Sequence, residues 1–193
     1  LLPGELAGGV HASPAGVDHA AVDDRRVGVG HDHVGRQEFD ALGDDEPGFE
    51  NAHRLALTTR VFKEAMRIYP PVIVLPRRAL EDVEVCGHTI PAGTIVFVSP
   101  YGIHHHPDVY PDPDRFDPDR FLPENEARRH RSAYLPFGAG PRVCLGIHFA
   151  MLEGPLVLAT LMRHVRFETD PARVVEPENF TTLRPAGGVP AVV

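Results

Sequence analysis

Apolar residues recur at helical spacing in the middle of the chain. Between residues 57 and 69 they share one helical face, at Leu57, Val61, Ala65 and Ile68. An α-helix turns once in about 3.6 residues, so this spacing predicts an amphipathic helix. Pro70 and Pro71 follow at once and cannot continue it. The pattern therefore predicts a helix of about three turns that ends at a double proline.

A second apolar stripe follows Cys144. Its members are Leu145, Phe149, Leu152 and Leu156. Their spacing predicts an amphipathic helix that reaches about His164. Pro155 lies inside this segment and is expected to bend the helix, because its nitrogen cannot donate a hydrogen bond to the carbonyl of Met151.

Alternating and β-branched residues predict short strands elsewhere. Val83–Cys86 and Thr94–Ser99 are β-prone, and the segment GHTIPAG between them predicts a turn followed by another short strand. Residues 107–123 contain five prolines, which suits neither a helix nor a central strand. Residues 180–193 carry a Gly-Gly pair before β-branched residues and predict a terminal hairpin. The expected fold class is mainly α with small β-sheets (α+β).

Charge divides the chain unevenly. Residues 1–50 hold eleven acidic residues against three arginines, whereas residues 51–193 hold sixteen of each sign. The first stretch also contains half of the eighteen glycines and no sustained apolar period. It offers little to bury, so we expect residues 1–54 to be a poorly ordered acidic, Gly-rich segment. Its composition is compatible with two roles, a flexible tail and a segment that docks onto a basic partner.

Composition excludes several classes of protein. Two cysteines, Cys86 and Cys144, cannot form a disulfide framework, and the sequence has no CxxC pair for zinc. The charge-balanced residues 51–193 show no basic cluster interleaved with aromatic residues, so no nucleic-acid partner is expected. No run of 18 apolar residues and no secretory leader is visible, so we expect no membrane segment and a cytoplasmic location for this chain.

Two motifs are uninformative when each is taken alone. Glu64 and Arg67 are neighbours on the first predicted helix, where a solvated ion pair worth a few tenths of a kcal/mol is the ordinary interpretation. Arg115 and Arg120 are the arginines of two copies of DPDRF in the proline-rich segment. A surface role is the default for both arginines, because Asp before Pro favours turns.

The segment YLPFGAGPRVCLGIHFA, residues 134–150, presents a single cysteine in a Gly-rich loop before a helix. Backbone amides and the start of the helix favour an ionised sulfur at Cys144. Gly138 and Gly140 permit positive φ angles and the close approach of a flat group. A nucleotide site is not supported, since Val143 stands where GxGxxG needs glycine and no GK[ST] follows.

Taken in order, these motifs resemble those of the cytochrome P-450 monooxygenases. The fixed positions of the haem-binding signature FxxGxRxCxG are filled by Phe137, Gly140, Arg142, Cys144 and Gly146, and Gly138 lies at a variable position within it. KEAMRIYPP at residues 63–71 is similar to the family's ExxR helix, and DPDRF at residues 117–121 resembles its PERF element. The resemblance covers residues 55–193. It implies the carboxy-terminal haem-binding half of the cytochrome P-450 fold, in truncated form.

The resemblance also implies roles for single residues. Cys144 would be the metal ligand and catalytic thiolate of heme b. Arg142, Arg77 and His104 would contact haem propionates through charge-assisted hydrogen bonds. Phe137 would pack beside the sulfur, next to Gly138, and shield it from water. Residues 72–75 would line the substrate pocket.

A second set of implied roles is structural. Glu64, Arg67 and Arg120 would form a buried charge network that braces the cysteine loop. The implied activity is insertion of one oxygen atom of O2 into a small organic substrate, with electrons from a ferredoxin or flavoprotein. This role assignment makes Cys144 the one residue on which the chemistry depends.

Departures from the family pattern leave alternatives open. His105 and His106 stand where many relatives have Arg and Asp, and no counterpart of the family's oxygen-activating helix is present. We therefore interpret the chain as a carboxy-terminal piece. The alternatives are a haem-binding or inert fragment without turnover, and a zinc protein that uses histidines. His11, His19, His31 and His33 lack ligand-like spacing for the latter.

Overall fold

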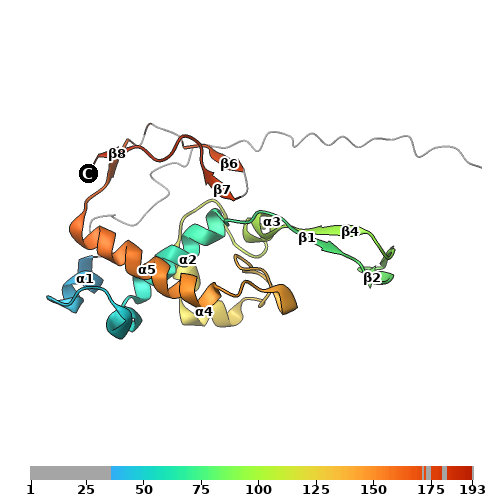
Figure 1. The fold of residues 1–193 in the computed structure, drawn as a ribbon, viewed down its shortest axis with the longest axis horizontal. Coiled ribbons are helices and arrows are strands. Elements are labelled where there is room, and N and C mark those ends of the chain that lie inside the picture. Colours follow the sequence, from blue (N-terminus) through green and yellow to red (C-terminus); the bar gives the residue numbers. More distant parts are fainter. Residues whose placement is uncertain (1–35, 171, 173–174, 180–181, 193) are drawn as a thin grey trace, which may run out of the picture.

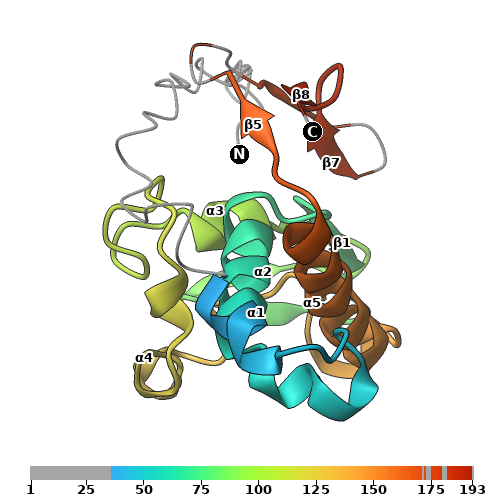
Figure 2. The same ribbon diagram turned by 90° about the vertical axis from the view of Figure 1, so that its left-hand side faces the viewer.

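Two helices form the centre of the molecule. The computed structural model describes residues 36–170, 172, 175–179 and 182–192. Helices α2 (Ala56–Ile68) and α5 (Ile147–His164) contact each other and lie side by side (Figures 1 and 2). Both helices were predicted from apolar spacing. Their positions match the predicted ranges to within three residues.

Helix α2 begins and ends for identifiable reasons. Its last residue precedes Tyr69 and the double proline, as predicted. At its start the carboxylate of Glu38 accepts hydrogen bonds from the backbone amides of Leu57 and Thr58 and from the Thr58 hydroxyl. The first amides of a helix have no partner within the helix, so a carboxylate there stabilises the helix start. Glu38 lies in helix α1 (Arg36–Leu42).

The packing of α2 on α5 explains the glycine in α5. A β-carbon on Gly154 would lie 2.3–2.7 Å from ring atoms of Phe62, a contact that no real side chain makes. Phe62 of α2 therefore packs against bare backbone of α5. The adjacent Pro155 is buried within the helix. Gly154 thus allows the two helices to approach closely.

The predicted apolar stripe of α5 is only half covered. Leu152 and Leu156 are partly buried, whereas Leu145 and Phe149 are 99% and 67% exposed. Leu145 also precedes the helix, which begins at Ile147. Spacing therefore predicted the helix, although it did not predict which of these residues are covered.

The amino-terminal side of α2 belongs to the packed part of the chain. Helix α1 and the 3-10 helix η2 (Phe49–Arg54) both contact α5. Leu42, Leu55 and Ala159 form a buried apolar cluster at this contact, supported by Phe39 and Leu156. The sequence had placed residues 1–54 in a poorly ordered segment. Residues 36–54 differ from that expectation because a few apolar side chains too sparse for a periodic signal pack onto α5, while residues 1–35 lie outside the described residues.

Four two-stranded antiparallel sheets complete the described fold. Strand β1 (Leu75–Arg78) pairs with β4 (Ile95–Val98), and β2 (Val83–Val85) pairs with β3 (His88–Ile90). These two pairs extend away from the helices as one long arm (Figure 1). The prediction of strands at residues 83–86 and 94–99, with a further short strand between them, is confirmed.

The carboxy-terminal strands pair differently from the prediction. Strand β7 (Leu183–Pro185) pairs with β6 (Pro177–Asn179), and β8 (Ala191–Val192) pairs with β5 (Glu168–Thr169). The predicted hairpin within residues 180–193 is therefore wrong. Gly187 and Gly188 do adopt positive φ angles of 70° and 82° after β7. The turn they make leads the chain to β5 instead of back along β7.

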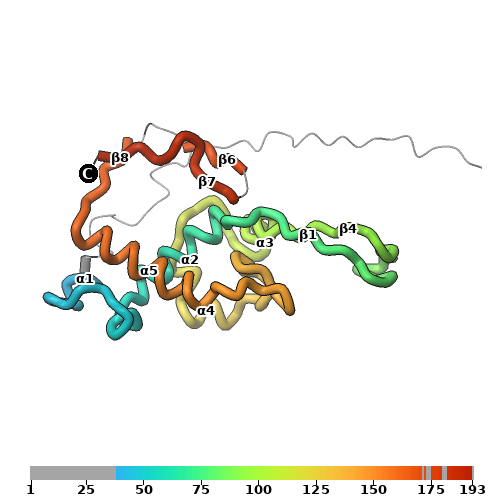
Figure 3. The backbone as a smooth tube through the Cα atoms, in the orientation of Figure 1, coloured from blue at the N-terminus to red at the C-terminus, as the bar shows by residue number. Residues whose placement is uncertain are grey.

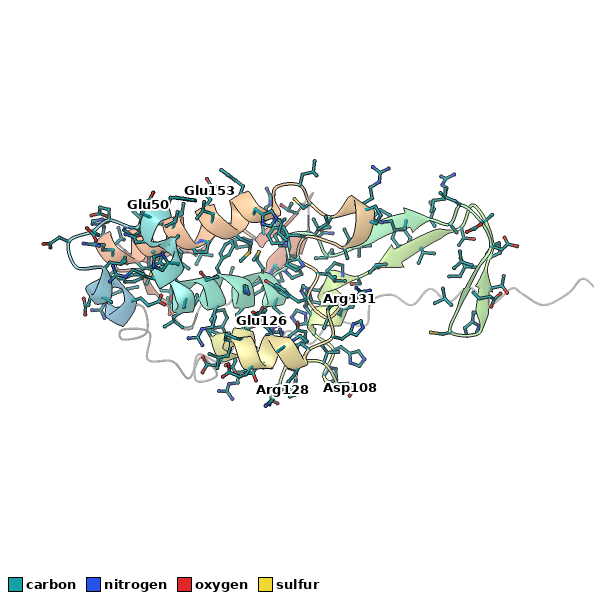
Figure 4. All side chains as sticks on the ribbon, turned by 90° about the horizontal axis from the view of Figure 1, so that it is seen from below. Glu50, Asp108, Glu126, Arg128, Arg131 and Glu153 are labelled. Atoms are coloured by element: carbon teal, nitrogen blue, oxygen red, sulfur yellow. The ribbon has the colours of Figure 1, made fainter. Side chains whose placement is uncertain are left out.

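Short helices connect α2 to α5. They are α3 (Pro100–His104), η3 (Pro118–Phe121), α4 (Pro123–Arg128) and η4 (Gly140–Arg142). Up to Pro123, where α4 begins, the proline-rich segment 107–123 contains no α-helix or strand and forms turns, bends and the single turn η3, in agreement with its composition. Helix α4 is held to α2 by Lys63, whose Nζ lies 2.8 Å from Oε1 of Glu126 (Figure 4).

The described residues agree with the predicted fold class, mainly α with small β-sheets. Among the helices of these residues, none combines the length and the apolar character needed to cross a bilayer.

Candidate functional site

The loop before α5 presents Cys144 at the surface. Its sulfur belongs to an exposed residue, and its backbone amide donates to the carbonyl of Phe137 at 3.0 Å. This bond closes the loop that contains η4. Gly138 and Gly140 have φ angles of 73° and 72°, a conformation that L side chains rarely adopt. The glycines predicted to shape the loop therefore do so through their backbone conformation.

The loop lies against strand β1. A β-carbon on Gly138 would meet Cδ1 of Leu75 at 3.6 Å, so the two residues are neighbours. Figure 3 follows the chain from α4 through this loop into α5, at the end of α5 that faces β1. Arg77 lies two residues after Leu75 and therefore on the same face of β1. Its guanidinium is exposed and donates to the carbonyl of Pro76.

The predicted charge network is present and buried. Both Glu64 and Arg67 are completely inaccessible to solvent. Arg67 Nε and Nη2 donate to the two carboxylate oxygens of Glu64 at 2.7 and 2.8 Å, a bidentate geometry. Arg120 approaches the same carboxylate, with Nε 3.4 Å from Oε1. The structure thus brings together all three residues that the sequence analysis assigned to this network.

Backbone groups complete the charge network. Arg67 also donates to the carbonyls of His104 and Arg115, and the amide of Asp117 donates to Glu64. Arg120 donates to the carbonyl of Asp112. The pKa of Arg120 is lowered from its ordinary value, chiefly by burial and then by the positive charge of Arg67. The network therefore holds the proline-rich segment onto α2.

His104 occupies a different place from the one expected. It is completely buried, Nδ1 lies 3.2 Å from the carbonyl oxygen of Arg67, and Nε2 accepts from the amide of Leu135 at 2.8 Å. Burial lowers the pKa of His104 to about 4. A propionate contact is contradicted by this geometry, because both ring nitrogens already have backbone partners and the neutral ring carries no charge to offer.

Aromatic residues around the charge network were missed in the sequence analysis. The guanidinium of Arg129 lies over the rings of Tyr110 and Phe121, at 4.8 and 5.1 Å from their centroids. Tyr110 donates to the carbonyl of Ala133, and Tyr134 donates to that of Lys63. No spacing pattern connects these residues, since they meet only after the proline-rich segment has folded over α2.

The donor set at the loop fits one kind of group. Cys144 supplies a single sulfur, and the exposed side chains beside it in sequence include apolar Leu145 and cationic Arg142. One sulfur with apolar and cationic neighbours suits a flat apolar group that carries a metal and peripheral anions. Within the described residues no group of three or more His, Cys, Asp or Glu side chains could hold a bare metal ion. The four histidines at positions 11, 19, 31 and 33 lie outside the described residues.

Comparison with known families identifies a match over most of the chain. The model of the family described as Cytochrome P450 matches residues 35–189. Putative cytochrome P450 132 of Mycobacterium tuberculosis is 42% identical over 158 residues, which cover 82% of this chain and 34% of that protein. Cyclooctatin synthase of Streptomyces melanosporofaciens is 41% identical over 144 residues, 75% of this chain and 31% of the synthase.

Solved structures show the same relationship. Cyanobacterial CYP120A1 with bound retinoic acid has a TM-score of 0.74 and 31% identity, and the match covers 81% of this chain and 38% of that one. The cytochrome P450DA heme domain has a TM-score of 0.72 and 33% identity, with coverage of 80% and 36%. The chain therefore spans about a third of the length of these proteins.

Proposed function

Because this chain belongs to the cytochrome P450 family, we propose that it forms the haem-binding end of a haem-thiolate monooxygenase, with Cys144 as the iron ligand. The observation that carries the proposal is the exposed Cys144 in a loop that its own amide closes by a hydrogen bond to Phe137, and whose backbone turns at two positive-φ glycines. Heme b ligated by a thiolate activates dioxygen, so that one oxygen atom enters an organic substrate and the other becomes water.

The loop residues bind and orient the cofactor in this proposal. Arg142 and Arg77 are both exposed and supply guanidinium groups for the haem propionates. Gly138 keeps the loop backbone against β1. Any residue with a side chain would be strained at this position, because the backbone φ angle is positive. Phe137 is half-buried and accepts from the Cys144 amide, so it anchors the residue that carries the sulfur.

The charge network acts at a distance from the haem. Glu64, Arg67 and Arg120 hold the proline-rich segment onto α2. The chain leaves that segment through α4 and then enters the cysteine loop. The network thereby fixes the direction from which the loop approaches, which is a structural role for buried charges.

A small apolar molecule is the substrate class that the sequence favours. Residues 72–75 follow the double proline and are Val, Ile, Val and Leu, which would contribute an apolar wall to the pocket. Electrons would come from a ferredoxin or flavoprotein that docks near Cys144, in a weak and largely electrostatic complex.

A haem-binding fragment without turnover is the second candidate. Two observations favour it: apolar side chains of α5 are exposed, and the chain spans only about a third of the length of its relatives. An open distal face would admit water, which competes with substrate oxidation. The two candidates share the same iron ligand and differ in whether product forms.

The thiolate ligand is tested by reconstitution of the full chain with heme b. We expect the carbon monoxide difference spectrum of the reduced protein to show the red-shifted Soret band of thiolate ligation. Cys144→Ser should abolish the band. Cys86→Ser is the matched control, because Cys86 is the other exposed cysteine and lies in the turn between β2 and β3. An unchanged band in Cys144→Ser would exclude the proposal.

Turnover is tested separately with a ferredoxin or flavoprotein reductase and NADPH. Product that forms in the intact chain and depends on Cys144 supports the monooxygenase. A normal thiolate spectrum without product supports the haem-binding fragment instead.

A further inference from the structure

The His104 imidazole joins two parts of the molecule through its two nitrogens. Nε2 faces the amide of Leu135, which can only donate, so Nε2 accepts and the proton lies on Nδ1. Nδ1 then donates to the carbonyl of Arg67, the only role open to a group that faces a carbonyl oxygen. The ring therefore bridges the last turn of α2 and the segment that leads to the cysteine.

On the α2 side of this bridge, His104 and Arg67 each donate a hydrogen bond to the other. Arg67 Nη1 donates to the backbone carbonyl of His104 at 2.9 Å, while the His104 ring donates to the carbonyl of Arg67. The ring also stacks on Tyr134, with centroids 5.3 Å apart and planes 28° apart. His104 thus has one orientation, fixed by the same arginine that forms the ion pair with Glu64.

The loop side continues from Leu135 to Cys144 through two short hydrogen-bonded steps. The carbonyl of Leu135 accepts from the amide of Gly138 at 3.1 Å. The carbonyl of Phe137 accepts from the amide of Cys144 at 3.0 Å. Leu135 is buried, whereas Cys144 is exposed, so the bond to His104 anchors the interior end of the cysteine loop.

We propose that His104 is a positioning residue: its acceptor nitrogen Nε2 transmits the geometry of the Glu64–Arg67 network to the loop that carries Cys144. The proposal rests on the function proposed above, since the loop matters because its sulfur binds iron. His104 itself does not touch the haem. Its bond to Leu135 carries the effect, and its bond to Arg67 holds the ring in place.

Two amide substitutions separate the two bonds. The amide of Asn lies near the position of Nδ1, so His104→Asn can keep the donor to Arg67 and lose the acceptor for Leu135. The amide of Gln reaches the position of Nε2, so His104→Gln can keep the acceptor for Leu135 and lose the donor to Arg67. Each variant leaves one buried backbone group without its partner, so similar costs to overall stability are expected.

The first measurement needs no haem. Amide hydrogen exchange in the cofactor-free chain reports the local opening of each hydrogen bond. Relative to the amides of α5, we expect His104→Asn to accelerate exchange at Leu135 and Cys144 by about tenfold, the effect of one lost hydrogen bond. His104→Gln should leave both amides near their wild-type rates. His88→Asn is the control, because His88 is exposed on β3.

The second measurement uses the chain loaded with heme b and carbon monoxide. The fraction of the signal in the thiolate Soret band should fall in His104→Asn and persist in His104→Gln. Equal exchange at Leu135 and Cys144 in the two variants, including equal loss of folding, would overturn the proposal and leave His104 a packing residue. Failure of the wild-type chain to show the thiolate band would refute the proposed function alone, because exchange tests the His104 bridge without haem.

Discussion

At the scale of single residues, the Glu64–Arg67 pair shows how burial changes the value of a charge. An exposed i, i+3 pair contributes a few tenths of a kcal/mol. Here both side chains are fully buried, and the carboxylate also faces Arg120 and the amide of Asp117. Removal of the carboxylate charge would leave two guanidinium groups without their anion in a region with little water.

We therefore predict that Glu64→Gln lowers the free energy of unfolding by about 3–5 kcal/mol. The substitution keeps the shape of the side chain, so the loss reports charge. Urea unfolding followed by circular dichroism measures it. Glu153→Gln is the control, because Glu153 is exposed on the outer side of α5 (Figure 4) and should change stability by less than about 0.5 kcal/mol. Equal effects of the two substitutions would contradict this interpretation.

His104 gives a prediction about pH. Its folded pKa is about 4 and its unfolded pKa about 6.5, so between these values the unfolded chain binds a proton that the folded chain does not. The contribution of His104 to the free energy of unfolding should therefore be fully present above pH 6.5. It should fall by about 3 kcal/mol as the pH drops to 4. Arg67, Arg129 and His105 face the ring, and their positive charges act in the same direction as burial.

The variant His104→Gln isolates this contribution from that of other groups, such as His105, whose pKa is also lowered by burial. Unfolding curves measured at several pH values should be less steeply dependent on pH in the variant than in the wild type. A variant with the same dependence would show that His104 does not titrate in this range.

Single residues also show the limits of inference from sequence. The resemblance to the family, carried by the motifs in their order, implied that Glu64, Arg67 and Arg120 meet, and the structure brings them together. The same reasoning gave His104 the wrong contact, because a motif records which residue is present and does not record the direction of its ring. The roles of Cys144, Arg142 and Arg77 toward haem stay predictions.

At the scale of elements, the contact between α2 and α5 depends on the absence of a side chain at Gly154. Inside a helix, alanine ordinarily makes the free energy of helix formation about 1 kcal/mol more favourable than glycine does. At this position its β-carbon would overlap the ring of Phe62. Overpacking of this kind costs about 1–3 kcal/mol, so the two effects have opposite signs.

We predict that Gly154→Ala destabilises the chain by about 1–2 kcal/mol, the overlap exceeding the gain in helix propensity. In a Phe62→Ala background the overlap is absent, and the same substitution should become stabilising by up to about 1 kcal/mol. A double-mutant cycle by urea unfolding measures this change of sign. Additive effects of the two substitutions would mean that the ring moves aside at no cost.

Elements with a strong local signal were predictable, and those fixed by distant contacts were not. Helical spacing and Pro70 were sufficient for α2. The start of α2 instead depends on Glu38, nineteen or twenty residues earlier, whose carboxylate no local motif connects to it. The strands β7 and β8 contain three and two residues, too few for a pattern to select their partners.

At the scale of the whole molecule, one face of α5 is only partly covered by the described residues. Phe149, Val157 and Leu161 recur at intervals of four and eight residues and are 67%, 51% and 44% exposed. The spacing places them along one ridge of the helix. The chain spans about a third of its relatives, which have more polypeptide available to cover such a surface.

An uncovered ridge of this kind favours association in water, because burial of each large apolar side chain is worth about 1.5–3 kcal/mol. We predict that the isolated chain self-associates as its concentration rises. The double variant Phe149→Ser/Val157→Ser should shift association to higher concentration, measured by sedimentation velocity. Its unfolding free energy should change little, since both side chains are mostly exposed already.

Leu80 provides the matched control for this surface effect. It is 91% exposed and lies between β1 and β2 on the arm, away from α5. Leu80→Ser removes a similar exposed apolar side chain without a change to the ridge. If Leu80→Ser lowered association as much as the double variant does, total exposed apolar area would govern self-association. A larger effect of the α5 variant would locate association on that helix, where the exposed apolar side chains lie along one ridge.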